Sequence, residues 1–165
     1  MKKLLVVLSL AMAAFSFQAS AATLNWVSTP VGATAIQVNP GSLYGARNPA
    51  GNPVLPGSLV DDNWTFMLSA FSQVQVGVSS LPGLASWLTA ELLDSTNALV
   101  ASIGVNGAIW RDVLGAGEYT LHLFGTAPLG QPSYALSVET PIPAAVWLFG
   151  SALMGLTGLS RRKKA

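Results

Sequence analysis

The sequence contains no cysteine and a single histidine. The absence of cysteine excludes disulfide bonds and thiolate metal ligands, so a folded domain in this chain must be held together by its hydrophobic core. The one histidine, His122, cannot build a zinc site by itself. We therefore predict no metal site and no other cofactor, and we interpret His122 as an ordinary strand residue that faces away from Tyr119 and Leu121.

Charged residues make up only 9% of the chain, and basic residues are scarce in its middle. Six of the eight Lys and Arg residues lie at positions 2–3 and 161–164. Residues 22–139 keep only Arg47 and Arg111 against seven acidic residues, so their formal charge is 2 − 7 = −5, although the whole chain reads +1. Because nucleic acids and anionic membrane surfaces are bound by clustered Lys and Arg, we expect neither of them as a partner of this segment.

A convincing helical period is also absent between residues 23 and 140. Apolar residues alternate with others instead, as in Trp64, Phe66 and Leu68. A period of two places one set of side chains on a buried face and the other set on the opposite face. Alternation or short apolar runs predict further strands at 24–28, 33–38, 74–78, 87–93, 98–103, 108–113, 119–124 and 134–138. We predict an all-β fold, an antiparallel β-sandwich of the jelly-roll or immunoglobulin-like type.

Turn-forming residues separate these predicted strands. Residues 94–97, Asp-Ser-Thr-Asn, predict a tight connection, and the glycines in 104–107 and 115–117 tolerate positive φ angles. Residues 39–57 hold four prolines, four glycines and three asparagines. That composition predicts a long irregular surface loop.

The N-terminus has the three parts of a secretory signal peptide. Lys2 and Lys3 precede an apolar run at 4–14, which is too short to span a membrane. Small residues at Ala19 and Ala21 mark the cleavage site, so we predict cleavage after Ala21, with Ala22 as the near alternative. Export of this kind requires the Sec translocon and signal peptidase as partners.

The C-terminus reads as a second membrane segment. Residues 142–159 carry no charge over 18 positions, and a helix there would be about 27 Å long, close to the roughly 30 Å of a bilayer core. The basic residues that follow predict a stop-transfer patch on the cytoplasmic side: Arg161, Arg162, Lys163 and Lys164. The apolar content is modest, which favours an anchor that is held for a time and then cut.

The order of residues in this tail resembles a known class of sorting signal. Pro-Ile-Pro-Ala-Ala-Val-Trp-Leu-Phe-Gly, closed by Arg-Arg-Lys-Lys, is similar to PEP-CTERM tails, and nearest to the subtype with Val-Pro-Leu-Pro-Ala. The resemblance implies processing by an exosortase, a membrane-embedded transpeptidase-like enzyme. It also implies a recognition motif at Pro141, Ile142, Pro143 and Ala144. The chain departs from the subtype at Thr140 and Ile142 and lacks the Glu of the parent motif, which leaves the exosortase subtype and the cut bond open.

A looser resemblance covers about 80 residues of the middle segment. Asp-Asp-Asn-Trp-Thr-Phe at 61–66 and the later Gly-Glu-Tyr-Thr-Leu-His-Leu-Phe-Gly at 117–125 look like the small β-sandwich ectodomains that often precede such tails. The resemblance implies a β-sandwich more than it implies a function. Together the patterns divide the chain into a signal peptide at 1–21, an exported domain at 22–139 and a sorting domain at 140–165.

Few residues of the exported domain are candidates for chemistry. Asp61, Asp62 and Asn63 could offer oxygen atoms to Ca²⁺, but we favour a turn cap before the strand at Trp64. Glu91 and Glu118 could serve glycoside hydrolysis only if the fold placed them across a cleft. Since no nucleophile elbow or phosphate loop occurs either, we predict no catalytic residues.

Four tryptophans of the exported domain could pack in the core or stack on sugar rings. We expect core positions for Trp26, Trp64, Trp87 and Trp110, with the last two singled out as possible exposed residues. The leading hypothesis is a non-enzymatic exported protein, transiently anchored in the inner membrane, that ends at the cell surface or in an exopolysaccharide matrix. The alternatives are a carbohydrate-binding or adhesive module, a permanently tail-anchored surface protein and, ranked low, a secreted hydrolase.

Overall fold

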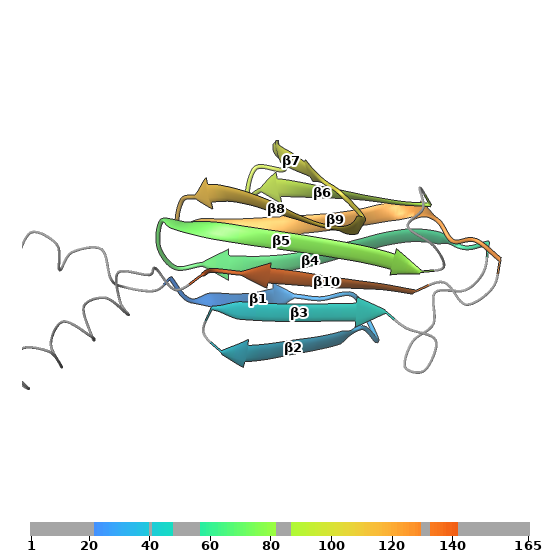
Figure 1. Cartoon of the computed structure of the whole chain (residues 1–165), viewed down its shortest axis with the longest axis horizontal. Coiled ribbons are helices and arrows are strands. Elements are labelled where there is room, and N and C mark those ends of the chain that lie inside the picture. Colours follow the sequence, from blue (N-terminus) through green and yellow to red (C-terminus); the bar gives the residue numbers. More distant parts are fainter. Residues whose placement is uncertain (1–21, 40, 48–56, 82–86, 130–132, 142–165) are drawn as a thin grey trace, which may run out of the picture. The chain divides into compact units, whose positions relative to one another are not determined.

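The computed structural model describes residues 22–39, 41–47, 57–81, 87–129 and 133–141 (Figure 1). They belong to one compact unit, Ala22–Pro141, which extends two residues beyond the end predicted for the exported domain. The predicted signal peptide and the predicted anchor at 142–159 lie outside the described residues. Within those residues, no helix is long and apolar enough to cross a membrane.

The described part of the chain consists of strands and their connections. Its ten strands are β1 (Leu24–Ser28), β2 (Thr34–Asn39), β3 (Ser42–Arg47), β4 (Leu59–Leu68), β5 (Ser72–Leu81), β6 (Leu88–Asp94), β7 (Leu99–Ile103), β8 (Asn106–Leu114), β9 (Gly117–Thr126) and β10 (Ser133–Glu139). Sheet A has the order β1-β4-β9-β6-β7, and sheet B has the order β2-β3-β10-β5-β8. All pairings are antiparallel, which confirms the predicted β-sandwich.

The chain passes repeatedly between the two sheets. From β4 onward, each strand lies in the opposite sheet from its predecessor, except that β6 and β7 form a hairpin in sheet A (Figure 1). The orders β3-β10-β5-β8 and β4-β9-β6-β7 are those of a jelly roll, and β1 and β2 extend one edge of each sheet. Distant parts of the sequence therefore become neighbours in one sheet.

The core lies between the sheets and is built by the alternating residues. Val74, Val76 and Val78 of β5 are buried, while the residues between them are more exposed. Trp64, Phe66 and Leu68 of β4 are completely buried; of the residues between them, Met67 is exposed, whereas Thr65 is buried too. The predicted inward faces of these strands are thus confirmed.

Trp64 is the largest fully buried side chain of this core. Its ring lies 5.3 Å from Trp26 and 6.4 Å from Tyr134, measured between ring centroids. Its Nε1–H donates to the Tyr134 hydroxyl at 3.0 Å. On the facing sheet, Gly45 of β3 lies directly over the indole, so a side chain there would overlap the ring.

The prediction of an irregular loop over residues 39–57 was wrong in its first part. Residues 42–47 form β3, which pairs with β2 on one side and with β10 on the other. Leu43 is completely buried, and Gly45 takes the next inward position because Trp64 occupies the space that a side chain would need. Because a glycine stands at this inward position, the sequence of β3 lacks the apolar alternation that would have indicated a strand. Residues 48–56 lie outside the described ranges.

The predicted tight connection at 94–97 is confirmed. Asp94 Oδ1 accepts hydrogen bonds from the Thr96 hydroxyl at 2.6 Å, the Thr96 N–H at 2.8 Å and the Ala98 N–H at 3.0 Å. Asn97 has a φ angle of 61°, which asparagine tolerates better than most residues. These hydrogen bonds lower the pKa of Asp94 below its usual value, and the hydrogen bond from the Thr96 hydroxyl has the largest effect.

Replacing Asp94 with alanine is expected to lower the melting temperature at pH 7, because the turn loses its acceptor. A carboxylate whose pKa is depressed by folding stabilises the protein above its unfolded-state pKa of about 4 and loses that effect as the pH falls through the folded-state value. The difference between Asp94→Ala and the parent should therefore shrink in acid. Thermal unfolding from pH 7 to pH 3, with Glu118→Ala as a control, measures it. A difference that grows in acid would contradict this account.

The two ends of the folded unit meet. The Thr140 N–H donates to the Gly41 carbonyl at 2.8 Å, and the Thr140 hydroxyl lies 3.2 Å from the Ala22 carbonyl oxygen. Ala22 and Thr140 are both buried. This contact closes the sandwich at the points where the chain enters and leaves it.

Candidate functional site

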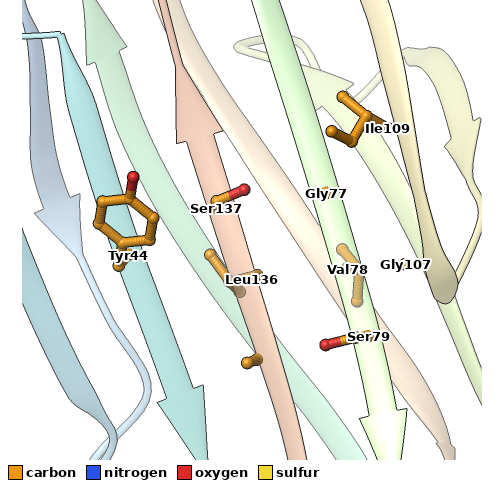
Figure 2. A pocket seen from close by; sticks show the side chains of 9 residues that line it. Tyr44, Gly77, Val78, Ser79, Gly107, Ile109, Leu136 and Ser137 are labelled. Carbon is orange, nitrogen blue, oxygen red and sulfur yellow. The ribbon is translucent and has the colours of Figure 1, made fainter.

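The outer face of sheet B carries a hollow of about 290 Å³ (Figure 2). Its floor is formed by small outward-facing residues of β5 and β10, and its two sides by Tyr44 of β3 and Ile109 of β8. We call this hollow the sheet B trough; its floor residues are Gly77, Ser79, Ala135 and Ser137.

The strand register explains why the trough forms there. Ser137 pairs with Tyr44 on one side and with Gly77 on the other, and Gly77 pairs with Ile109. One row across four strands therefore reads large, small, small, large. The inward neighbours of the floor, Val78 and Leu136, are buried apolar residues. Alternation on β5 and β10 thus builds the core on one face and a recess on the other.

Tyr44 is held in a defined orientation. Its hydroxyl donates to Glu139 Oε1 at 2.9 Å. This hydrogen bond, followed by burial and the negative charge of Glu139, raises the pKa of the tyrosine. The side chain is 38% exposed, and in Figure 2 its ring is seen face-on beside the floor. A second hollow, of about 180 Å³, lies on its other side toward Ile36.

The floor offers neutral polar groups. Within the described residues, the hydroxyls of Ser79 and Ser137 make no side-chain hydrogen bond, and no charged side chain lines the trough. Charged side chains lie in the next outward-facing row along the strands, where Glu139 pairs with Gln75, and Gln75 pairs with Arg111. The trough can thus offer hydrogen bonds and a ring face to a ligand, but it holds no group arranged for acid–base chemistry.

His122 lies on the outer face of sheet A, as predicted, while Leu121 and Leu123 point into the core. Its Nε2 lies 2.8 Å from Asp61 Oδ1, and its ring stacks on Phe124 with centroids 4.8 Å apart. Among the described residues, no group of three or more His, Asp or Glu side chains is placed to hold a metal ion.

Asp61, Asp62 and Asn63 neither cap a turn nor form a calcium loop; both interpretations were wrong. They lie inside β4, which runs without interruption from Leu59 to Leu68. Alternation sends Asp61 outward to His122 and Asp62 inward. The buried Asp62 carboxylate accepts hydrogen bonds from Arg47 Nη1, at 2.8 and 2.9 Å, and from the Tyr134 hydroxyl at 2.6 Å. Burial, aided by Asp62, raises the pKa of Tyr134.

The two glutamates considered for hydrolysis are not brought together. Glu91 lies on β6 opposite His122, and Glu118 lies on β9 opposite Met67. Glu118 and His122 are four residues apart on β9, so the two glutamate backbones are separated by about 13 Å along the sheet. Neither residue lines either of the two hollows of sheet B.

The tryptophans belong to the core or pack against it. Trp64 is completely buried, and Trp26, Trp87 and Trp110 are half-buried and packed against the core cluster. Among the described tryptophans none is exposed, so the aromatic surface considered for Trp87 and Trp110 is not formed. The exposed aromatic ring at the trough is Tyr44, which the sequence reasoning missed because it placed this residue in a loop. The two large residues Leu43 and Tyr44 were the feature of the sequence that could have indicated a strand there.

The predicted processing residues lie at or beyond the edges of the described chain. Ala22 is buried at the start of the folded unit, and Pro141 is half-buried at its end. The other residues of the cleavage site, the motif and the stop-transfer patch lie outside the described residues: Ala19, Ala21, Ile142, Pro143, Ala144, Arg161, Arg162, Lys163 and Lys164.

The class defined by the fold is an antiparallel β-sandwich with jelly-roll strand order. No family model and no curated protein matches this chain. Among solved structures, this chain is similar to one described as carbohydrate binding module family29. The alignment covers 72% of this chain and 88% of the chain in that structure. The sequence identity is 9% and the TM-score is 0.33. A likeness at that level supports no inference about a ligand or an activity.

Proposed function

We propose that this chain is a non-enzymatic exported protein, held in the inner membrane by its C-terminal tail until an exosortase-type enzyme processes it there. It would then remain at the cell surface or in the extracellular polysaccharide matrix. The observation that carries the proposal is the extent of the folded unit, Ala22–Pro141. Its first residue follows the predicted cleavage site at Ala21, and its last residue, Pro141, is the first residue of the predicted sorting motif.

The closure of the sandwich supports removal of both flanking segments. Thr140 joins Gly41 and Ala22 through backbone and hydroxyl hydrogen bonds, so the ends are tied by groups that belong to the domain itself. Cleavage after Ala21 and a second cut beyond Pro141 would leave these hydrogen bonds and the core in place. A cut before Thr140 would remove one of the partners. Folding therefore favours a cut bond on the C-terminal side of Thr140.

The intact mass of the exported protein tests this proposal. We expect an N-terminus at Ala22 and a polypeptide that ends within residues 140–144, without Arg161–Lys164. Replacing Pro141 and Pro143 with alanine should leave the tail attached, because the motif is lost. The matched control Pro30→Ala changes a proline of the folded unit far from the motif and should be processed normally. A mature species that still ends at Ala165 would establish the permanent tail anchor instead.

A further inference from the structure

We propose that the sheet B trough binds a neutral polysaccharide strand, with the ring of Tyr44 stacked on a sugar ring. The inference rests on the proposed function in one respect only: the proposed location at the cell surface or in the matrix is where the protein would meet such a polymer. The binding itself depends on the outer face of sheet B, far in sequence from the processing motif at Pro141 except for the strand β10. The argument starts from the shape of the trough.

The trough has the dimensions of a small ligand site. Its sides stand on β3 and β8, which are separated by three strand spacings, about 14 Å from backbone to backbone. Successive outward residues on each floor strand lie about 7 Å apart, so Gly77 with Ser79 and Ala135 with Ser137 form a short, nearly flat floor. The volume of about 290 Å³ falls at the lower end of the range for small-molecule sites.

The lining matches the two-sided chemistry of a pyranose ring. A sugar ring presents C–H groups on its faces and hydroxyl groups around its rim. The electron-rich face of an aromatic ring such as that of Tyr44 attracts the C–H face. The hydroxyls of Ser79 and Ser137 can each donate and accept hydrogen bonds with the rim. Because Glu139 already holds the Tyr44 hydroxyl, the ring is oriented before a ligand arrives, which lowers the entropic cost of binding.

Charge favours a neutral polymer over an anionic one. No charged residue lines the trough, and the register row at one end of it carries one acidic and one basic residue, Glu139 and Arg111. The folded segment carries a formal charge of −5, from two basic and seven acidic residues at 22–139. An anionic polysaccharide would be repelled by this net negative charge and would meet no cation in the trough, whereas a neutral one is not penalised.

Other occupants fit the trough less well. A peptide that adds to a sheet needs an unpaired strand edge, but β10 and β5 are paired on both sides. An acyl chain would leave the floor hydroxyls without partners, which costs free energy. A second copy of the chain would bring the same negative charge to the interface.

Affinity electrophoresis of the exported protein tests the inference, with gels that contain hydroxyethyl cellulose, galactomannan or dextran, and with alginate as the anionic probe. We expect retardation by at least one of the three neutral polymers and none by alginate. Tyr44→Ala, which removes the ring, and Ser137→Leu, which fills the floor, should each weaken the binding at least about tenfold. Tyr44→Phe keeps the ring and should retain most of the affinity.

Met67→Ala is the matched control, because Met67 is also 38% exposed but lies on the outer face of sheet A. Circular dichroism and thermal unfolding of each variant separate lost binding from lost folding. The inference is overturned if no neutral polymer retards the protein, if alginate alone does, or if both trough variants bind like the parent. Intact mass of the same samples reports processing independently. Lost binding with normal processing removes this inference alone, and retained binding with an uncut tail removes only the proposed function.

Discussion

Replacement of Trp64 with alanine is expected to lower the free energy of unfolding by roughly 3 to 5 kcal/mol. The side chain is completely buried between the sheets and contacts Trp26 and Gly45. Its removal leaves a large cavity and deprives the Tyr134 hydroxyl of a hydrogen-bond donor. Since a domain of this size is stabilised by only about 5 to 15 kcal/mol, this single change should remove a large share of the total.

Urea unfolding of the exported protein, followed by circular dichroism, measures this loss. Phe71→Ala provides the control, because Phe71 is an aromatic residue that is 76% exposed. Its removal should change the free energy of unfolding by less than about 0.5 kcal/mol. Equal effects of the two substitutions would show that Trp64 is not the centre of the core.

Replacement of Gly45 with alanine is expected to destabilise the domain by about 1 to 3 kcal/mol, since overpacking a filled core forces side chains or strands apart. A methyl group there would overlap three atoms of the six-membered ring of Trp64. A leucine side chain in place of the indole lacks those atoms. Gly45→Ala should therefore cost much less in a Trp64→Leu background than in the parent, which gives a favourable coupling in a double-mutant cycle.

Gly115→Ala is the control for this cycle, because a Cβ at Gly115 would have room: it would lie 4.0 Å from the Tyr119 hydroxyl oxygen. It should cost little in either background. If Gly45→Ala were equally harmful in the parent and in the Trp64→Leu background, the overlap would not be its cause, and the backbone of β3 would be the alternative source of the effect.

Most strands could be predicted from the sequence, because buried apolar and more exposed residues alternate along a strand that is buried on one face only. The alternations at Trp64–Leu68 and Val74–Val78 were sufficient to find β4 and β5 and the side that each one buries. The strand β3 was missed for a physical reason. The residue that belongs at one of its inward positions is a glycine, and only the indole of a distant strand explains why.

The pairing of Asp62 could not be predicted either. A buried carboxylate interrupts the apolar pattern of β4, and such a residue usually indicates a turn or a ligand site. Its partners, Arg47 and Tyr134, come from β3 and β10 in the other sheet. Sequence order contains no information about which two of the few polar residues will meet across a core.

The sequence by itself determined the all-β class, the inward faces of most strands and the proposal of two processing signals, because each of these depends on residues that are close together along the chain. Only the tertiary structure decided the sheet B trough. Tyr44, Gly77, Ile109 and Ser137 share one row because the chain, crossing between the sheets, brings β3, β10, β5 and β8 side by side in sheet B in a particular register. That register results from the packing of the whole sandwich, and no local stretch of the chain specifies it.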